Sequence, residues 1–223
     1  MFTQTSLTPP RAVLFDLDGT LLDTAPDLGA ALNAVLRAEQ RPEVTAKEYT
    51  PLASHGSVRL LKHAFGEEFD ARQEELRRAF LTAYSTAIAK HTRLFDGVSH
   101  LLNKLVEQQI AVAIVTNKPS ALTNQLLPYF PQLAAIEVVV SGDTLAVAKP
   151  HPEPLLFAAE QLAIPAQQCW YVGDAQRDIE AGQRAQMTTV LAAYGYLSED
   201  DQPAQWGADK HIHHPLELLQ LWS

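Results

Sequence analysis

Two aspartates, Asp16 and Asp18, follow a short apolar run and stand two residues apart in the sequence Asp-Leu-Asp-Gly-Thr. The run at 12–15 predicts a buried strand that ends at Asp16, and an extended backbone would point both carboxylates to one side. Acids at the carboxyl end of a buried strand lie where an open α/β sheet places its ligand. Paired aspartates suit a hard cation such as Mg²⁺, and one of them can also attack an electrophile. An exposed turn is the plainer alternative, whereas a Ca²⁺ loop is disfavoured because Gly19 comes too early for one.

Further polar residues follow later apolar runs that also predict strands. They are Thr116 and Asn117 after the run at 110–115, Lys149 in the connection after 136–140, and Gly173-Asp174 after 169–172, with Asp178 one helical turn later. In a parallel sheet these strand ends lie at one edge, so the groups can converge with the first two acids. Acids, a lysine, a hydroxyl and an amide together favour phosphoryl transfer, because charge on the transferred group must be neutralised while an oxygen nucleophile approaches.

The elements that would position these residues alternate from residue 96 onward, where apolar runs are separated by amphipathic helical patterns. This alternation predicts a parallel sheet covered on both faces. Between Leu22 and about Phe95 only helical patterns occur. We therefore predict an α/β fold with a doubly wound parallel-sheet core, residues 1–22 and 96–223, and a small all-helical cap, residues 23–95, inserted after strand 1. Within the cap, residues 54–57 are predicted as a loop in which Ser57 is the N-cap of the next helix.

The composition is that of a soluble globular protein, with 223 residues, 47% apolar content and a net charge of −9. This acidic balance argues against a nucleic-acid partner, because phosphate backbones are bound by clustered Lys and Arg. The first ten residues have no signal-peptide pattern, and no apolar run approaches the roughly 20 residues of a membrane span. We therefore expect a cytoplasmic protein without a membrane partner. The single cysteine, Cys169, lies in an apolar run that predicts a packed core thiol. Nothing in the sequence predicts an oligomeric state.

Together the motifs resemble those of the haloacid dehalogenase (HAD) superfamily, in its branch of phosphatases with a small helical cap. The matching segments are Asp16 to Thr20 (DxDGT), Thr116, Lys149, and Gly173 to Asp178 (GDxxxD), in the order of the family. The resemblance covers essentially the whole chain. It implies a Rossmann-like core and a Mg²⁺-dependent phosphatase that acts on a small phosphorylated metabolite.

The mechanism of the family implies a role for each matching residue. Asp16 would be the nucleophile that forms an aspartyl-phosphate, and Asp18 would be the general acid and base. Lys149 would neutralise the phosphate and keep Asp16 ionised. The phosphate oxygens would also be bound by Thr116 and Asn117. The Mg²⁺ ligands would be Asp16, Asp18 through its backbone carbonyl, Asp174, and Asp178 as a ligand or as an acid beside the metal.

The cap is expected to choose the substrate, because phosphate binding is generic and a lid closes over the rest of the molecule. The candidate specificity residues are His55, Gly56, Ser57 and Arg59, although a solvated helix face explains Arg59 equally well. Segments 21–27 and 116–119 resemble phosphoglycolate phosphatases, whereas segments 91–97 and 194–209 resemble N-acetylmuramic acid 6-phosphate phosphatases of peptidoglycan recycling. We therefore expect 2-phosphoglycolate or N-acetylmuramic acid 6-phosphate as the substrate. Two alternatives share the motifs: a phosphosugar mutase, and a non-catalytic regulator that keeps the fold.

Two features lie outside the motifs. Gln186 stands where relatives usually have a glycine at the end of a helix, which predicts a left-handed non-glycine residue or another helix ending. His211, His213 and His214 have no acid or cysteine at ligand spacing, so an edge strand and a surface turn are favoured over a metal site.

Overall fold

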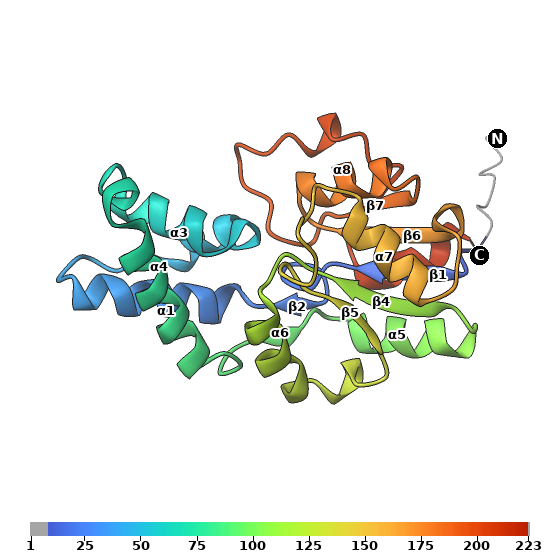
Figure 1. Cartoon of the computed structure of the whole chain (residues 1–223), viewed down its shortest axis with the longest axis horizontal. Coiled ribbons are helices and arrows are strands. Elements are labelled where there is room, and N and C mark those ends of the chain that lie inside the picture. Colours follow the sequence, from blue (N-terminus) through green and yellow to red (C-terminus); the bar gives the residue numbers. More distant parts are fainter. Residues whose placement is uncertain (1–8, 223) are drawn as a thin grey trace.

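Strand β1 (Ala12–Phe15) lies inside a parallel sheet in the computed structural model, which describes residues 9–222 (Figure 1). The other strands of this sheet are β4 (Ala111–Val115), β5 (Val138–Val140), β6 (Cys169–Gly173), β7 (Thr188–Ala192) and β8 (Lys210–Ile212). Their order is β5-β4-β1-β6-β7-β8, and every neighbouring pair is parallel. The order of strands reverses around β1, which makes the carboxyl end of β1 the ligand-binding position of such a sheet.

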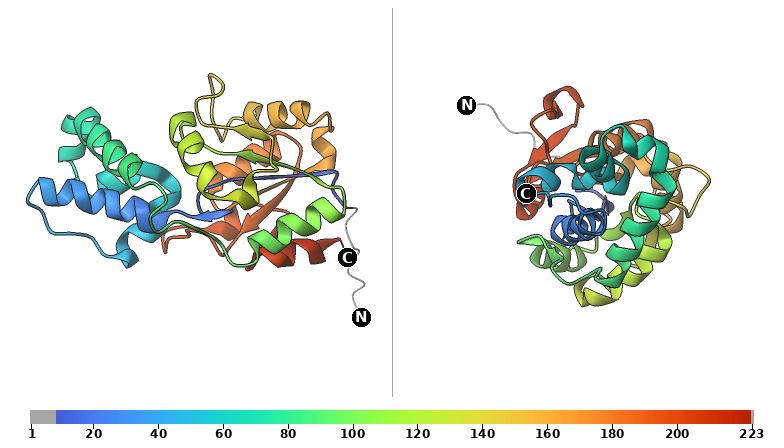
Figure 2. Two further views of the ribbon diagram at one scale, coloured as in Figure 1. Left: turned by 90° about the horizontal axis from the view of Figure 1, so that it is seen from below. Right: turned by 90° about the vertical axis from the view of Figure 1, so that its left-hand side faces the viewer.

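Strand β1 is apolar at every position, and both of its faces are buried. Val13 and Phe15 face one hydrophobic cluster, whereas Ala12 and Leu14 face the other. The core helices are α5 (Val98–Glu107), α6 (Ser120–Leu126), α7 (Glu153–Gln161) and α8 (Gln176–Arg184). The 3₁₀ helices of the core are η2 (Leu127–Tyr129), η3 (Pro131–Leu133), η4 (Ala166–Gln168), η5 (Pro203–Gln205) and η6 (Pro215–Leu221). Helices α5 and η6 cover the first face, and α7 and α8 cover the second (Figure 2). The predicted doubly wound core is confirmed.

Helices make up most of the insertion that follows β1. They are α1 (Ala25–Ala38), α2 (Ala46–Tyr49), α3 (Gly56–Phe65) and α4 (Glu68–Thr86), together with the 3₁₀ helix η1 (Thr50–His55). Helices α1, α3 and α4 lie beyond one end of the sheet, on the left of Figure 1. Two short strands, β2 (Leu22–Asp23) and β3 (Arg93–Leu94), pair antiparallel where the chain enters and leaves this helical part.

Two local predictions for the insertion are wrong. The absence of strands between Leu22 and Phe95 does not hold, because β2 and β3 are too short to carry an alternating pattern and form only through their mutual pairing. The predicted loop at 54–57 is helical instead: η1 ends at His55 and α3 begins at Gly56. Ser57 therefore lies inside the first turn of α3 and is not its N-cap.

Buried hydrogen bonds fasten the start of α1 to the segment that leaves the insertion. The Asp27 carboxylate accepts hydrogen bonds from the backbone N–H and the hydroxyl of Thr92 at 2.8 and 2.7 Å. The Tyr196 hydroxyl donates to Asp23 Oδ1 at 2.7 Å and accepts from the backbone N–H of Ala25 at 2.9 Å. Segments 21–27, 91–97 and 194–196, which are distant in sequence, thus meet at one junction between core and insertion.

Several smaller predictions are confirmed. Gln186 is left-handed, with φ 59°. His211 lies in the edge strand β8. Cys169 is buried, and burial raises the pKa of its thiol to about 11. No helix within residues 9–222 is long and apolar enough to span a membrane. The predicted assignment of residues 1–8 to the core lies outside the described residues.

Candidate active site

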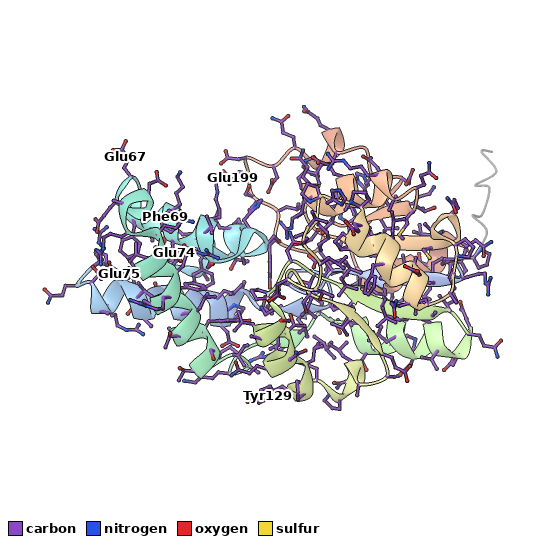
Figure 3. All side chains as sticks on the ribbon, in the orientation of Figure 1. Glu67, Phe69, Glu74, Glu75, Tyr129 and Glu199 are labelled. Atoms are coloured by element: carbon purple, nitrogen blue, oxygen red, sulfur yellow. The ribbon has the colours of Figure 1, made fainter. Side chains whose placement is uncertain are left out.

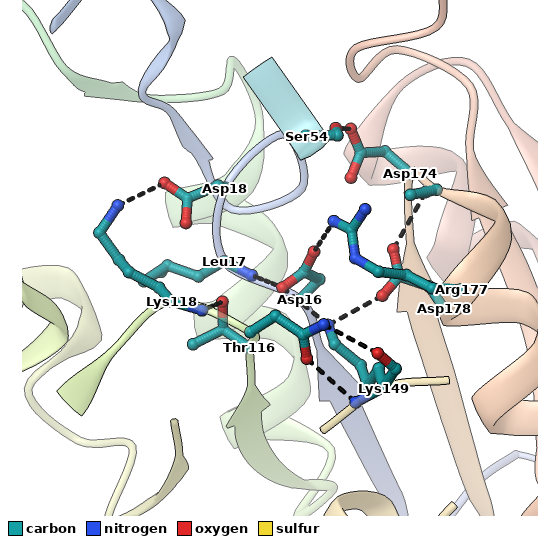
Figure 4. Close-up of polar contacts among 12 residues, drawn as sticks. Asp16, Leu17, Asp18, Ser54, Thr116, Lys118, Lys149, Asp174, Arg177 and Asp178 are labelled. Atoms are coloured by element: carbon teal, nitrogen blue, oxygen red, sulfur yellow. Dashed lines mark hydrogen bonds and ion pairs between the residues drawn. The ribbon is translucent and has the colours of Figure 1, made fainter. Parts of the chain in front are cut away.

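The carboxyl ends of β1, β4 and β6 bring the motif residues together. Asp16 follows β1, Thr116 follows β4 and Asp174 follows β6, and these three strands are neighbours in the sheet. Figure 4 shows their side chains around one space, with Lys149 reaching in from the connection between β5 and α7. Asp16, Thr116 and Lys149 are each at most 3% exposed. The convergence expected from the strand ends therefore occurs.

Lys149 is the central cation of this site. Its Nζ lies 2.9 Å from Asp16 Oδ1 and 2.8 Å from Asp178 Oδ1. The same ammonium donates to the Val115 carbonyl at 2.8 Å and to the Tyr171 hydroxyl at 2.7 Å. Burial raises the pKa of the Asp16 carboxyl, and the Lys149 ammonium opposes this rise. For Asp178, the positive charges of Lys149 and Arg177 outweigh burial, so that its pKa lies below the ordinary value.

Three buried carboxylates form a group that can hold a cation. Oxygens of Asp16, Asp174 and Asp178 all lie within 4.8 Å of one another. Asp174 Oδ1 is fully buried and has no hydrogen-bond partner among the described residues. Burial, together with the neighbouring acids, raises the pKa of Asp174 to about 7. Hard oxygen ligands and an unpartnered carboxylate oxygen both fit a divalent cation such as Mg²⁺.

Asp18 lies apart from this group of acids. Its Oδ1 accepts hydrogen bonds from the Thr24 hydroxyl at 2.6 Å and from Lys118 Nζ at 2.8 Å. Lys118 also donates to the hydroxyl of Tyr84, on cap helix α4, at 2.9 Å. Since the Asp18 carboxylate is not among the grouped acids, only its backbone carbonyl remains as a candidate metal ligand. Asp16 and Asp18 line the same pocket, as the spacing of the two acids predicts.

The side chain of Asn117 is hydrogen-bonded to the loop that carries Lys149. Its amide donates to the Lys149 carbonyl at 2.9 Å, and its Oδ1 accepts from the Lys149 backbone N–H at 3.0 Å. Both ends of the side chain therefore hold the Lys149 loop. The hydroxyl oxygen of Thr116 accepts from the backbone N–H of Lys118 at 3.2 Å, which leaves its proton for a ligand.

Two cations of the site are absent from the sequence-based assignment. Arg177 lies on α8 with a guanidinium nitrogen 3.8 Å from Asp16 Oδ2, and Lys118 binds Asp18. Both line the pocket. Arg177 is the cation of the GDxxxD segment and Lys118 directly follows the Thr116-Asn117 pair. Their proximity to predicted catalytic residues was the available signal, but nothing in the spacing distinguishes them from surface cations.

A pocket of about 400 Å³ lies between the strand ends and the cap. From the cap, its lining includes the predicted residues His55, Gly56 and Ser57. The His55 imidazole is exposed at this pocket, yet partial burial and the Arg177 charge hold its pKa below its usual range. Arg59 is exposed on α3 and does not appear in the lining, which fits the solvated helix face. The cap residue Ser54 reaches further and donates a hydrogen bond to Asp174 (Figure 4).

Segment 194–196 packs directly behind the acids. The backbone N–H of Tyr196 donates to Asp174 Oδ2 at 2.9 Å, and the Tyr194 hydroxyl donates to the Thr20 carbonyl at 3.0 Å. A Cβ added to Gly195 would stand 2.4 Å from both the Gly19 carbonyl oxygen and the Asp174 Cβ. Only glycine fits between these two parts of the site.

Comparisons with known proteins agree with this geometry. The model of the family described as haloacid dehalogenase-like hydrolase matches residues 13–192. A phosphoglycolate phosphatase from Xanthomonas campestris is 44% identical over 214 residues, which cover 96% of this chain and 96% of the relative. An N-acetylmuramic acid 6-phosphate phosphatase from Pseudomonas aeruginosa is 38% identical over 212 residues, covering 95% and 94%.

A solved structure supports the same fold. The crystal structure of a predicted phosphoglycolate phosphatase from Haemophilus somnus matches with a TM-score of 0.85 at 26% identity. The match covers 97% of this chain and 100% of that protein. Core and insertion therefore have the same arrangement in both proteins.

Proposed function

The chain belongs to the haloacid dehalogenase-like hydrolases and is a phosphatase of small phosphorylated metabolites, and from this premise we propose that it forms an aspartyl-phosphate on Asp16 with Mg²⁺ as its cofactor. The observation that carries the proposal is the environment of Asp16. Its buried carboxylate lines the pocket and lies between the positive charges of Lys149 and Arg177. A carboxylate with this access can attack phosphorus while both cations neutralise the phosphate oxygens.

In the first step, Asp16 attacks phosphorus and the bond between phosphorus and the ester oxygen breaks. Asp18 donates its proton to the departing oxygen, which leaves as an alcohol. In the second step, water attacks the aspartyl-phosphate, Asp18 accepts a proton from it, and phosphate leaves as Asp16 is restored. The Thr116 hydroxyl, the Asn117 backbone and Lys149 are proposed to bind the phosphate oxygens.

The proposed cofactor site uses the acids that the strand ends bring together. Asp16, Asp174 and Asp178, the last as a ligand or as an acid beside the metal, would hold Mg²⁺, together with the backbone carbonyl of Asp18. The cation, when bound, supplies positive charge to the phosphate and to the nucleophilic carboxylate. The unpartnered Oδ1 of Asp174 supports this assignment.

We further propose that residues 23–95 act as a cap over this site, with β2 and β3 as its junction to the core. Two contacts from the cap reach the catalytic groups: Ser54 to Asp174, and Tyr84 through Lys118 to Asp18. Cap position is thereby coupled to the acids that perform the chemistry. The proposed substrates are N-acetylmuramic acid 6-phosphate and 2-phosphoglycolate, the compounds in the names of the relatives.

A phosphate-release screen tests the proposal. It would compare kcat/KM for these two compounds, hexose phosphates and nucleotides, with and without Mg²⁺, in wild type and in Asp16→Asn. We expect Mg²⁺-dependent release that Asp16→Asn abolishes and that Asp200→Asn, at an exposed carboxylate, leaves intact. Unchanged turnover by Asp16→Asn would overturn the mechanism. A requirement for trace sugar bisphosphate, with isomerisation in place of release, would identify a mutase instead.

A further inference from the structure

Arg77, on cap helix α4, carries a positive charge that the protein leaves poorly paired. Its Nε is fully buried and has no hydrogen-bond partner within residues 9–222. Glu74 lies 3.7 Å from Arg77 Nη1, but the Glu74 side chain is 91% exposed. This distance is too long for a hydrogen bond, and water screens such a surface pair. Figure 3 labels Glu74 in the cap, away from the sheet.

The guanidinium belongs to the wall of the pocket described above. Arg77, Phe80, Leu81 and Tyr84 all line it, and their spacing places them on one face of α4. Tyr84 marks the catalytic end of that face, because its hydroxyl shares Lys118 with Asp18. Tyr84 lies seven positions after Arg77 in the helix, which corresponds to a rise of about 10 Å.

Apolar side chains separate the two charged ends of the pocket. Phe80 and Leu81 lie between Arg77 and Tyr84 on α4, and Leu28 of α1 and Leu122 of α6 also line the pocket. Lys118 and Arg177, the other guanidinium or ammonium groups of the lining, lie beside the catalytic acids Asp18 and Asp16. A substrate that spans this pocket would therefore present its phosphate at one end and meet the weakly paired guanidinium of Arg77 at the other.

We propose that Arg77 binds a carboxylate of the substrate and thereby selects phosphomonoesters whose carboxylate is remote from the phosphate, as in acidic sugar phosphates. The inference rests on the phosphatase function proposed above and adds a specificity-determining residue to it. The Arg77 side chain is 37% exposed although its Nε is buried, and the two terminal nitrogens of a guanidinium present parallel N–H groups that match the two oxygens of a carboxylate. A carboxylate bound there would give the guanidinium a closer partner than the exposed Glu74.

This arrangement separates the two proposed substrates. In 2-phosphoglycolate a single methylene group joins the ester oxygen to the carboxylate, so the acid stays close to the reacting phosphorus. In N-acetylmuramic acid 6-phosphate the sugar ring lies between the phosphate and the lactyl carboxylate, which suits two helical turns of separation. A volume of about 400 Å³ also falls in the range of sites that enclose drug-sized ligands. The geometry favours the sugar acid.

A matched pair of substrates tests the role of Arg77. Steady-state kcat and KM would be measured for N-acetylmuramic acid 6-phosphate and for N-acetylglucosamine 6-phosphate, which lacks the lactyl carboxylate. The enzymes would be wild type, Arg77→Gln, and Arg78→Gln as a control at the exposed neighbour on α4. We expect wild type to prefer the carboxylated sugar by about 10- to 100-fold in kcat/KM, mainly through KM. Arg77→Gln should bring this ratio close to one, whereas Arg78→Gln should retain it.

Two results would overturn the inference: a wild type that does not distinguish the sugars, or an Arg77→Gln variant that keeps the preference. Turnover of p-nitrophenyl phosphate by Arg77→Gln checks that the variant is folded and that its catalytic end is intact. If wild type releases phosphate from none of these esters, the proposed phosphatase function fails as well. If wild type releases phosphate from both sugars with equal efficiency, the carboxylate contact is refuted and the phosphatase function is not.

Discussion

At the scale of single residues, Asn117 holds the loop that carries Lys149. Its amide closes two hydrogen bonds with the backbone of Lys149, the residue whose ammonium lies between Asp16 and Asp178. The position of that ammonium therefore depends on a side chain 32 residues earlier in the sequence, just after β4. Asn117 acts on the reaction through Lys149, which makes it a positioning residue.

Asn117→Ala should lower kcat more than it raises KM, because Lys149 loses its alignment while the other phosphate contacts remain. Two lost hydrogen bonds should also reduce the free energy of unfolding by about 1–3 kcal/mol. Steady-state kinetics and thermal unfolding of the purified variant measure both effects. An increase in KM with unchanged kcat and unchanged stability would instead mean that the side chain itself binds phosphate.

At the scale of elements, the three-residue segment 194–196 determines how closely the chain after β7 packs against the acids of the site. Gly195 sits against the Gly19 carbonyl and the Asp174 side chain, and Tyr196 bonds to both Asp174 and the start of the cap. One short segment therefore positions a proposed metal ligand and the junction with the insertion. A substitution in this segment should disturb the position of the acids more than that of the sheet.

Gly195→Ala should weaken Mg²⁺ activation, because the new Cβ displaces Asp174 or the Gly19 backbone. Overpacking of this kind typically costs about 1–3 kcal/mol of stability. Gly66→Ala is a suitable control, since Gly66 has φ 59° and open space around its Cβ position. It should lose stability through backbone strain yet keep the Mg²⁺ concentration for half-maximal activity. Equal Mg²⁺ dependence in the two variants would refute the packing argument.

The sequence predicted the elements that carry strong periodic patterns and the groups at their ends. Asp16, Thr116 and Asp174 could be placed because each terminates a buried apolar run, and parallel strands bring such ends together. The sequence could not place three cations at the pocket, namely Arg177, Lys118 and Arg77. A cation on a helix or loop has the same local pattern whether it faces a pocket or water. The side-chain partner of Asn117 likewise depends on a loop remote in sequence.

At the scale of the whole molecule, the acids make the stability of the protein depend on pH and on Mg²⁺. Burial raises the pKa of Asp174 from the ordinary 3.8 to about 7, a difference equivalent to about 4 kcal/mol. The folded protein keeps this proton up to about pH 7, whereas the unfolded chain loses it near pH 3.8. The contribution of Asp174 to stability is therefore present at acid pH and is lost as pH rises through 7.

Asp174→Asn should remove this pH dependence. Between pH 5 and 8, metal-free wild type should lose Tm relative to the variant, because a neutral amide has no charge to bury. Mg²⁺ should raise the Tm of wild type at pH 8 and leave that of Asp174→Asn nearly unchanged. Thermal unfolding across pH, with Mg²⁺ or with a chelator, provides the readout. If wild type and Asp174→Asn had parallel Tm profiles across pH and equal Tm shifts with Mg²⁺, Asp174 would not be part of the cation site.

The covalent step on Asp16 is the centre of this account, and acid-quenched mass spectrometry tests it most directly. The Asp18→Asn variant should accumulate the intermediate, because it lacks the group that activates water for the second step. After brief mixing with an activated phosphomonoester and Mg²⁺, the peptide containing Asp16 should gain the mass of one phosphoryl group. The Asp16→Asn/Asp18→Asn double variant should gain none. A phosphoryl group on another residue, or no labelled peptide in a variant that still releases the leaving group, would contradict the mechanism.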